Sequence, residues 1–313
     1  MVSLVTGGAG FIGSHLTEAL VARGGRVRVL DDFSTGRRDN LDTVRDRVEL
    51  IEGSVTDREA VAAAMQGVQW VFHLAALPSV QRSVEDPEAT HEACVTGTLR
   101  VLSAARAAGV RRVVYAASSS AYGDTPGMVR KEDDPVAPLS PYAAAKLAGE
   151  HYCRCFTATY GLETVRLRFF NIFGPRQNPY SPYSGVIARF IAAMTAGQPP
   201  IIYGDGLQSR DFTYVDNAVQ ALLRAAEAPA AVGNVYNIGS GGTVRVLDLV
   251  ARLNELLGTT LQPVHHPPRP GDVRHSQADI SRARRDLGYE PTVSFPVGLR
   301  RTLEAFRRMT KPE

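Results

Sequence analysis

The chain opens with the stretch VSLVTGGAGFIG, residues 2–13, in which a short apolar run leads into closely spaced glycines. Residues 15–21 continue with the apolar spacing of a helix. A strand, a glycine-rich turn and a helix in this order let a pyrophosphate approach the backbone at the helix N-terminus, where N–H groups point outward. The stretch therefore predicts a dinucleotide-binding turn at the carboxyl end of a buried strand.

An acidic pair ends the next apolar run. Residues 26–30 predict a second strand, and Asp31 follows it about twenty residues past the glycine turn, where a carboxylate grips a ribose diol. Asp31 and Asp32 would repel a 2′-phosphate, which favours NAD over NADP as the cofactor. Arg37 and Arg38 lie close enough in the sequence to leave NADP open as the alternative.

The N-terminal half alternates between strand and helix patterns. Right-handed crossovers between such elements give an α/β fold with a doubly wound parallel sheet, helices on both faces and a ligand crevice at the carboxyl ends of the strands. The expected strands cover residues 2–6, 26–31, 47–51, 69–74, 112–117 and 163–169. The expected helices cover residues 12–23, 57–66, 88–108 and 141–160.

Beyond residue 170 the chain becomes rich in Pro, Gly, Tyr and Asn, which predicts an irregular segment and then a smaller, interleaved lobe. The expected division is a nucleotide-binding domain at 1–170, to which 215–238 returns, and a substrate lobe at 171–313. His265 and His266 lie in a Pro-rich stretch without matching ligands, so we expect a loop and no metal site. Helices are expected at 185–196, 215–227, 246–257, 279–286 and 296–308, and strands at 201–203 and 234–238.

The bulk properties argue against several other classes of protein. The 313 residues carry a net charge of +3, and the basic residues occur as scattered pairs, so we expect no nucleic-acid partner. Apolar stretches stay shorter than a membrane span, and a strand that starts at residue 2 leaves no room for a signal peptide. Three cysteines without metal-type spacing favour a reducing cytoplasm.

A second informative stretch is YAAAK, residues 142–146, which places a phenol and an ammonium on one face of a helix. A cation near Tyr142 lowers a phenol pKa that is ordinarily about 10, so the phenolate becomes a usable base. Lysine is scarce in this chain, which makes Lys146 at this spacing informative. Ser118, Ser119 and Ser120 follow the apolar run 113–117 and offer hydroxyls to orient or shuttle the proton. The pattern predicts redox chemistry on a hydroxyl group.

Further motifs follow in order along the chain: HLAA at 73–76, SSSAYG at 118–123, SPYAAAK at 140–146, RFFN at 168–171, SRDF at 209–212 and GDV at 271–273. Together with residues 6–13, this set resembles the extended short-chain dehydrogenase/reductases, and within them the NAD-dependent UDP-sugar 4-epimerases. The resemblance covers nearly the whole chain. It implies that Tyr142 takes the 4-hydroxyl proton, with Ser118 as the catalytic hydroxyl, while C4 exchanges hydride with NAD through a 4-keto sugar.

The resemblance also implies the residues of each site. The residues expected at the cofactor are Gly7, Gly10, Phe11, Ile12, Gly13, Asp31, Asp32, Ser34, Gly36, Ser54, Val55, Leu74, Ala75, Ala76, Tyr142 and Lys146. Those expected at the substrate are Ser79, Ser118, Ser119, Ser120, Asn171, Val186, Tyr203, Arg210, Arg269, Asp272 and Ser276. Among them, Arg210 and Arg269 match diphosphate-binding arginines, and Tyr203 matches an aromatic that stacks on uracil. Core packing is the alternative for Tyr203.

Two positions suggest the reaction and the sugar. Relatives that dehydrate the 4-keto sugar carry an acidic pair where this chain has Ser119 and Ser120, so the resemblance favours simple epimerisation. The same resemblance implies that Ser276 stands where a bulky residue would exclude an N-acetyl group at C2. We therefore expect activity on UDP-N-acetylglucosamine and UDP-N-acetylgalactosamine, with UDP-glucose and UDP-galactose alongside. A UDP-glucuronate 4-epimerase remains the competing enzyme, and a non-catalytic NAD-binding regulatory protein is the alternative of another class.

The quaternary expectation is a homodimer. Helices 88–108 and 141–160 resemble the pair that builds a four-helix dimer interface in this family, and small residues such as Ala104 and Ala108 suit close packing.

Overall fold

A computed structural model describes residues 2–125, 127–179, 185–268 and 273–309. Its main feature is a sheet of seven parallel strands in the order β12-β7-β5-β4-β1-β2-β3. The reversal of direction beside β1 is the topological switch point at which such sheets bind ligands. The strands are β1 (Val2–Thr6), β2 (Arg26–Asp31), β3 (Val48–Glu52), β4 (Trp70–His73), β5 (Arg112–Ser118), β7 (Glu163–Phe169) and β12 (Val235–Ile238). The expected doubly wound α/β fold is confirmed.

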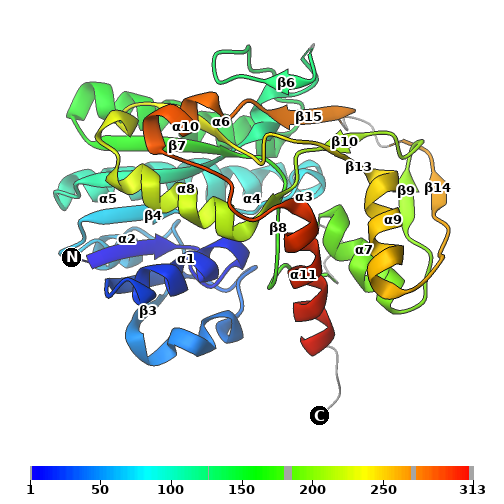
Figure 1. The fold of residues 1–313 in the computed structure, drawn as a ribbon. Coiled ribbons are helices and arrows are strands. Elements are labelled where there is room, and N and C mark those ends of the chain that lie inside the picture. Colours follow the sequence, from blue (N-terminus) through cyan, green and yellow to red (C-terminus); the bar gives the residue numbers. More distant parts are fainter. Residues whose placement is uncertain (1, 126, 180–184, 269–272, 310–313) are drawn as a thin grey trace.

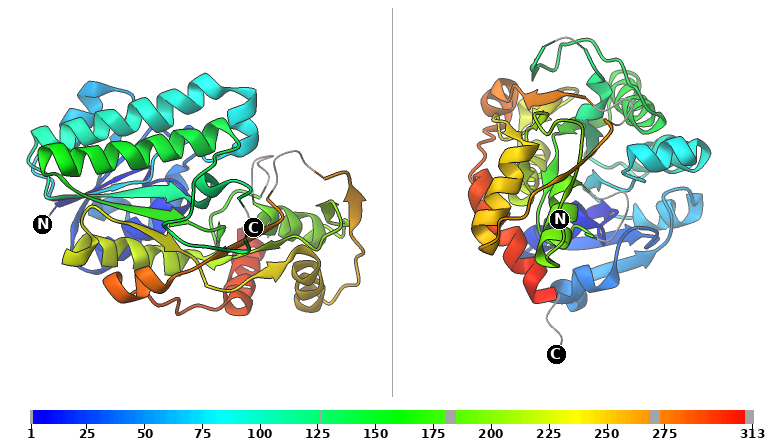
Figure 2. Two further views of the ribbon diagram at one scale, coloured as in Figure 1. Left: turned by 90° about the horizontal axis from the view of Figure 1, so that it is seen from above. Right: turned by 90° about the vertical axis from the view of Figure 1, so that its right-hand side faces the viewer.

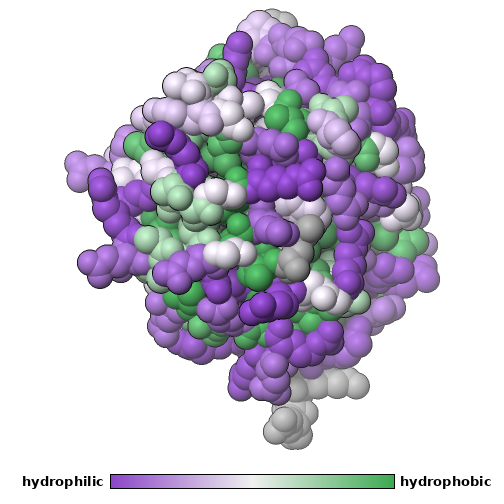
Figure 3. Space-filling model, turned by 90° about the vertical axis from the view of Figure 1, so that its left-hand side faces the viewer, coloured by the Kyte–Doolittle hydropathy of each residue, from purple (hydrophilic) through white to green (hydrophobic). Residues whose placement is uncertain are grey.

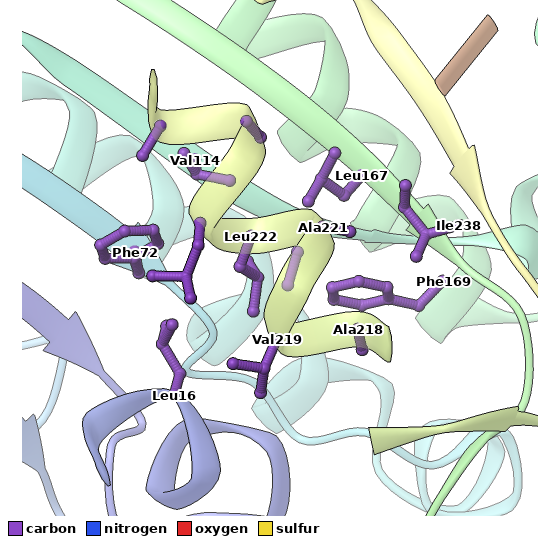
Figure 4. Close-up of a cluster of buried hydrophobic side chains, with 14 of the residues drawn as sticks. Leu16, Phe72, Val114, Leu167, Phe169, Ala218, Val219, Ala221, Leu222 and Ile238 are labelled. Atoms are coloured by element: carbon purple, nitrogen blue, oxygen red, sulfur yellow. The ribbon is translucent and has the colours of Figure 1, made fainter. Parts of the chain in front are cut away.

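Helices cover both faces of this sheet, as Figures 1 and 2 show. On one face lie α1 (Phe11–Ala22) and α8 (Val215–Glu227), and the other carries α2 (Arg58–Ala64), α5 (Gly97–Ala107) and α6 (Pro141–Tyr160). Each layer buries its own apolar cluster. Figure 4 shows α8 pressing Leu222 and Ala221 toward Val114 and Leu167 of the sheet, with Leu16 of α1 beside them. Burial of these clusters fixes the carboxyl ends of the strands, where the site lies.

The strand at one edge of the sheet comes from late in the chain. β12 pairs with β7 in parallel, so that Val235–Ile238 lie opposite residues 166–169. The helix before it, α8, packs on the same sheet. The stretch 215–238 therefore lies with the first half of the chain, whereas the division of the protein into two domains stays a prediction.

The remaining elements form a second lobe, at the right of Figure 1. Its core lies between helices α7, α9 and α11 and contains Phe173, Phe190, Leu249 and Leu303. Its helices are α7 (Val186–Thr195), α9 (Val246–Leu257) and α11 (Phe295–Met309). The helix α10 (Ser281–Leu287) instead packs against β12 and α8 of the large sheet. The strands are short: β6 (Val129–Arg130), β8 (Ile172–Phe173), β9 (Ile201–Tyr203), β10 (Ser209–Arg210), β11 (Thr213–Tyr214), β13 (Val244–Arg245), β14 (Val264–His266) and β15 (His275–Ala278).

The expected continuous helix at 88–108 is wrong in detail. The segment consists of α4 (Pro87–His91), a π-helical turn η2 (Glu92–Thr96) and then α5, and a further short helix, α3 (Val80–Glu85), precedes it. The hydroxyl of Thr98 donates to the carbonyl of Cys94 at 2.6 Å, inside the widened turn. Such back-bonding competes with the helical hydrogen-bond ladder, and the apolar spacing of the segment does not reveal it.

Among the described residues, seven short strands were not predicted: β6, β8, β10, β11, β13, β14 and β15. His265 and His266 belong to β14, which pairs with β9, so the expected loop is wrong. β6 leaves the first half of the chain and pairs with β15 of the second lobe. Both pairings are too short, and β14 too exposed, to produce a recognisable apolar pattern. The other connecting turns are 3-10 segments: η1 (Arg38–Arg47), η3 (Ser119–Tyr122) and η4 (Pro229–Ala231).

Within the described ranges, the helices are too short or too polar to span a bilayer. Hydrophilic side chains interrupt the hydrophobic ones across the face in Figure 3.

Candidate functional site

The glycine turn between β1 and α1 is closed tightly against its surroundings. Gly7 has a φ of +71°, and a Cβ there would lie 2.8 Å from the backbone nitrogen of Ala75. A Cβ on Gly13 would lie 2.1 Å from the carbonyl oxygen of Gly7. Side chains are therefore excluded at both positions, which keeps the backbone accessible to a ligand.

The start of α1 is open for an anion. Gly10 is the N-cap residue, and no side chain of the described residues caps this helix. The first backbone N–H groups of a helix have no partner within the helix, and they carry the positive end of its dipole. Phe11, Ile12 and Gly13 present these groups, so the residues present fit a dinucleotide pyrophosphate.

The carboxylate of Asp31 lies beside the same turn. Its oxygens accept hydrogen bonds from the backbone N–H groups of Ala9 at 2.8 Å and Phe33 at 2.9 Å. Burial raises the pKa of Asp31, and these two hydrogen bonds oppose the shift. A Cβ on Gly36 would lie 2.8 Å from an Asp31 oxygen, so the loop passes close to the carboxylate. Asp31 is thus held in place at the end of β2, beside the glycine turn.

The two arginines that left NADP open already bind carboxylates. Arg37 pairs with Asp39, and Arg38 pairs with Glu52 while its guanidinium lies 4.1 Å from the ring of Phe33. Neighbouring acids at Asp31 and Asp32 add negative charge. The arrangement fits NAD.

The other cofactor candidates lie around the same sheet edge with different local roles. Asp32 accepts from the backbone N–H of Ser34 at 2.9 Å. The hydroxyl of Ser54 accepts from Thr56 at 2.9 Å, so it is engaged within its own turn. Val55 is buried against Gly97, and residues 74–76 continue from β4 beside Gly7.

The helix that carries Tyr142 and Lys146 starts at a defined cap. Ser140 accepts a hydrogen bond from the N–H of Ala143 at 3.2 Å, and Pro141 occupies the first helical position. Burial raises the pKa of Tyr142 above its ordinary value, and a smaller contribution from the nearby Ser118 hydroxyl lowers it. The expected serine and tyrosine are therefore brought together from β5 and α6.

Lys146 points into the protein. Only 4% of its surface is exposed, and its Nζ donates to the carbonyl oxygen of Ala116 at 2.9 Å. Burial lowers the pKa of Lys146. Beside it, the hydroxyls of Ser118 and Ser120 lie 2.8 Å apart, and the N–H of Ser120 donates to the Ser118 hydroxyl at 3.2 Å. The site thus contains a phenol, an ammonium and two coupled hydroxyls, which can hold and move a proton.

The second lobe places two substrate candidates directly opposite each other. Arg210 of β10 pairs in register with Ser276 of β15. The Arg210 guanidinium donates to the carbonyl oxygens of Ser209 at 2.9 Å and Arg274 at 3.1 Å, which turns it across the strand pair. A guanidinium suits paired phosphate oxygens because its donors are planar and forked.

The side chain of Asp211 links separate segments of the second lobe. This role was not predicted from the sequence. Its buried carboxylate accepts hydrogen bonds from Ser240, Gly241 and Ala278. Burial raises its pKa against the pull of these donors. The side-chain amide of Asn171 donates to the Asp211 carbonyl at 3.4 Å, and Asn171 has a φ of +32°, a strained backbone that Asn tolerates better than most residues. The available signal in the sequence was an acidic residue, Asp211, within the motif SRDF at 209–212.

The remaining substrate candidates are more scattered. Ser79 caps α3 by accepting from the N–H of Arg82 at 3.0 Å, and Val186 is the first residue of α7. Tyr203 ends β9, and its ring lies 5.7 Å from that of His266 in an edge-on arrangement. Arg269 and Asp272 lie outside the described residues. Within the described ranges there is no cluster of His, Cys, Asp and Glu side chains fit to hold a metal.

A buried ion pair behind the catalytic helix was also missed. Arg168 of β7 forms a forked hydrogen-bonded pair with Glu150 of α6, with contacts of 2.8 Å and 2.9 Å. The Arg168 guanidinium also lies 4.7 Å from the ring of Tyr122, just past the serine turn. A charged residue within an apolar strand pattern was the available signal, since buried arginines require partners.

A dinucleotide cradle and a Ser–Tyr–Lys group at one edge of a doubly wound sheet define a nucleotide-dependent dehydrogenase-type protein. Comparisons with known proteins agree: the NAD dependent epimerase/dehydratase family matches residues 3–239. The chain belongs to this family.

Relatives match over nearly the full length. A UDP-glucose 4-epimerase of Mycolicibacterium smegmatis is 41% identical over 99% of this chain and 100% of its own. The structure of a Thermotoga maritima UDP-glucose 4-epimerase with UDP-glucose superposes with a TM-score of 0.95 at 38% identity, covering 99% of this chain and 100% of that one. A UDP-N-acetylglucosamine 4-epimerase from Methanobrevibacter ruminantium, in complex with UDP-N-acetylmuramic acid, gives a TM-score of 0.94 at 36% identity and covers 98% of both chains.

Proposed function

We propose that this protein is an NAD-dependent 4-epimerase of UDP-hexoses that interconverts UDP-N-acetylglucosamine and UDP-N-acetylgalactosamine, and also accepts UDP-glucose and UDP-galactose. The observation that carries the proposal is the buried Lys146 ammonium, which lies four residues after Tyr142 on α6 and donates to Ala116, two residues before the paired hydroxyl of Ser118. Relatives named UDP-glucose 4-epimerase and UDP-N-acetylglucosamine 4-epimerase support the proposal.

The proposed mechanism follows from the protons and the charges that these side chains can carry. Tyr142 takes the proton from the sugar 4-hydroxyl, and the Ser118 hydroxyl keeps that oxygen in line. NAD, when bound at the glycine turn, supplies reversible hydride exchange with C4. The Lys146 ammonium favours the phenolate by its charge. Tyr142 would return the proton to the sugar oxygen, and the hydride exchange that NAD would supply is reversible, so the epimer forms with no net oxidation.

The serine turn supports epimerisation over elimination. Ser119 and Ser120 have hydroxyls that cannot act as the carboxylate base and carboxylic acid of a dehydration at C5 and C6. The Ser118–Ser120 contact of 2.8 Å instead ties the turn together. A sugar held there can be oxidised at C4 and reduced again without loss of water.

The substrate preference rests on the strand pair of the second lobe. Arg210 and Ser276 lie opposite each other, so a diphosphate bound at Arg210 brings the attached sugar near Ser276. Serine leaves space beside C2, where an N-acetyl group is larger than a hydroxyl. We infer that this space admits the N-acetylated substrates.

We also propose that the protein is a homodimer. A groove of about 510 Å³ lies between α4, η2 and α6. Pro87, Val95, Pro141, Ala144 and Ala148 line it together with Ala145, Glu88 and His91. The small and apolar side chains among them suit close helix packing against a second copy. Sedimentation or light scattering should give twice the mass of 33.8 kDa, and a monomer at micromolar concentration would contradict the proposal.

The activity test uses purified protein with UDP-N-acetylglucosamine, UDP-glucose and UDP-glucuronate in separate reactions, with and without added NAD. Chromatography then detects each C4 epimer. Conversion of the N-acetyl sugar is the expected result. Conversion of glucuronate alone would keep the mechanism and overturn the substrate choice. Absence of conversion with NAD supplied would favour a binding or regulatory role on the same fold.

A further inference from the structure

Tyr115 lies directly beneath the catalytic lysine. It belongs to β5, one residue before Ala116, whose carbonyl oxygen accepts the Lys146 ammonium. The Tyr115 ring centroid lies 5.0 Å from Nζ, and the Tyr115 hydroxyl donates to the main-chain carbonyl of Lys146 at 3.3 Å. One side chain therefore contacts both the backbone and the ammonium of Lys146.

The surroundings leave Tyr115 little freedom to move. Only 1% of its surface is exposed. On the helix side, a Cβ on Gly149 would lie 2.2 Å from the Tyr115 hydroxyl, so α6 approaches the phenol as closely as a glycine allows. On the sheet side, the ring of His73 lies 5.6 Å away with an interplanar angle of 36°. Tyr115 is clamped between the catalytic helix and His73.

His73 is itself fixed by two threonines. Its Nδ1 lies 2.7 Å from the hydroxyl of Thr6, the residue before the glycine turn, and its Nε2 lies 3.0 Å from that of Thr98. Burial, with a smaller contribution from Lys146, lowers the pKa of His73 to about 3. The imidazole is therefore uncharged at neutral pH and adds no repulsion to the nearby ammonium.

The electrostatic surroundings of Lys146 are otherwise mixed. Burial lowers the pKa of Lys146, whereas Cys94, Cys153 and Glu150 shift it in the opposite direction. Tyr142 lies one turn before it on the same helix. The other titratable groups around Lys146 are His73 of β4, Tyr115 of β5, Cys94 of η2, and Glu150 and Cys153 of α6. The negative face of an aromatic ring attracts a cation without adding a titrating charge.

We propose that Tyr115, backed by His73, is a positioning residue that holds the Lys146 ammonium beside the Tyr142 phenol. This inference rests on the proposed role of Lys146 in catalysis. Tyr115 touches neither the sugar nor the cofactor in this scheme. It acts through the lysine, and a rigid buried ring lets the ammonium occupy one position through both halves of the reaction.

The test compares Tyr115→Leu, which removes the ring, with Tyr115→Phe, which keeps the ring and removes the hydroxyl. Val113→Ala is the matched control, since Val113 is buried in the same apolar cluster on the same strand. The readouts are kcat, KM and the pH profile of kcat/KM. With Tyr115→Leu, a less fixed cation stabilises the phenolate less. The acidic limb of the profile should therefore move to higher pH by roughly 0.5–1 unit, with a fall in kcat and little change in KM.

The control variants separate positioning from simple loss of stability. Tyr115→Phe should shift the pH limb less than Tyr115→Leu, and Val113→Ala should lower stability without shifting it. In the wild-type background, Gly149→Ala should lower kcat by displacing the Tyr115 ring. In the Tyr115→Leu background, the same substitution should lower kcat by a smaller factor, because there is no phenol to displace.

The experiment distinguishes a failure of the proposed function from a failure of the proposed role of Tyr115. An inactive wild-type protein in the presence of NAD would overturn the proposed function. An active wild-type protein whose Tyr115→Leu variant keeps the same pH limb, or shifts it no more than Val113→Ala, would overturn the role of Tyr115 alone.

Discussion

The two halves of the site are built in different ways. The catalytic half lies on long, buried elements: β5 and β7 have seven residues each, and α6 has 20. The substrate half lies on short strands, with two residues in β10 and four in β15. In the first half a packed core fixes the side chains, and in the second a few polar contacts do so. The residues that we propose for the chemistry are thus held by deep packing, whereas those that we propose for the sugar are held by a small number of hydrogen bonds.

The largest expected effect is on the catalytic half. Tyr142→Phe removes the proton acceptor and should reduce kcat by roughly two to four orders of magnitude. NAD binding should persist, because the glycine turn and Asp31 lie on other elements. Turnover assays combined with NAD titration check both statements. Wild-type turnover in this variant would remove Tyr142 from the mechanism.

The buried ion pair behind α6 should come next. Glu150→Ala leaves the Arg168 guanidinium buried without its carboxylate, which typically costs about 3–5 kcal/mol of stability. Denaturant unfolding of the variant and wild type measures the difference. The substitution of both residues, Glu150→Leu with Arg168→Met, should recover much of the loss, since it leaves no unpaired charge. A single variant as stable as wild type would show that packing holds α6 without this pair.

The equivalent test in the substrate half is Asp211→Ala. Three backbone N–H groups, of Ser240, Gly241 and Ala278, lose their acceptor, and the stability should fall by roughly 2–3 kcal/mol. Because Asp211 connects β15 to the loop after β12, KM for the UDP-sugar should rise more than kcat falls. Asp211→Asn, which keeps one acceptor oxygen, is the milder control. Equal effects on NAD affinity and on substrate KM would contradict the separation of the two halves.

The smallest expected effect concerns selectivity alone. Ser276→Tyr fills the space opposite Arg210 and should reduce kcat/KM for UDP-N-acetylglucosamine roughly tenfold or more relative to UDP-glucose. Ser276→Ala keeps the space and should leave the ratio near its wild-type value. Both sugars are measured with the same enzyme preparation. An equal loss on both would place the N-acetyl pocket elsewhere.

Much of the fold could be predicted from local patterns. The strands at 2–6, 26–31 and 163–169 and the helix at 141–160 occur with the expected bounds, because long apolar periods and clear caps dominate there. The π-helical turn at Glu92–Thr96 and the strand β14 were not predictable in this way. The first depends on a hydroxyl that competes for a backbone carbonyl, and the second on a pairing between exposed segments. The roles of the individual site residues stay predictions.

Groups whose geometry is local could be predicted from neighbouring residues alone. The glycine turn, the acid after β2, and the four-residue spacing of Tyr142 and Lys146 follow from neighbouring residues and helix periodicity. Only the tertiary structure decided which distant groups meet: Ser118 with Tyr142, Arg210 with Ser276, and Tyr115 with His73 beneath the lysine. The reason is physical. Local conformation follows from nearby sterics and hydrogen bonds, whereas contacts between distant residues follow from sheet order and core packing, which the whole chain determines together.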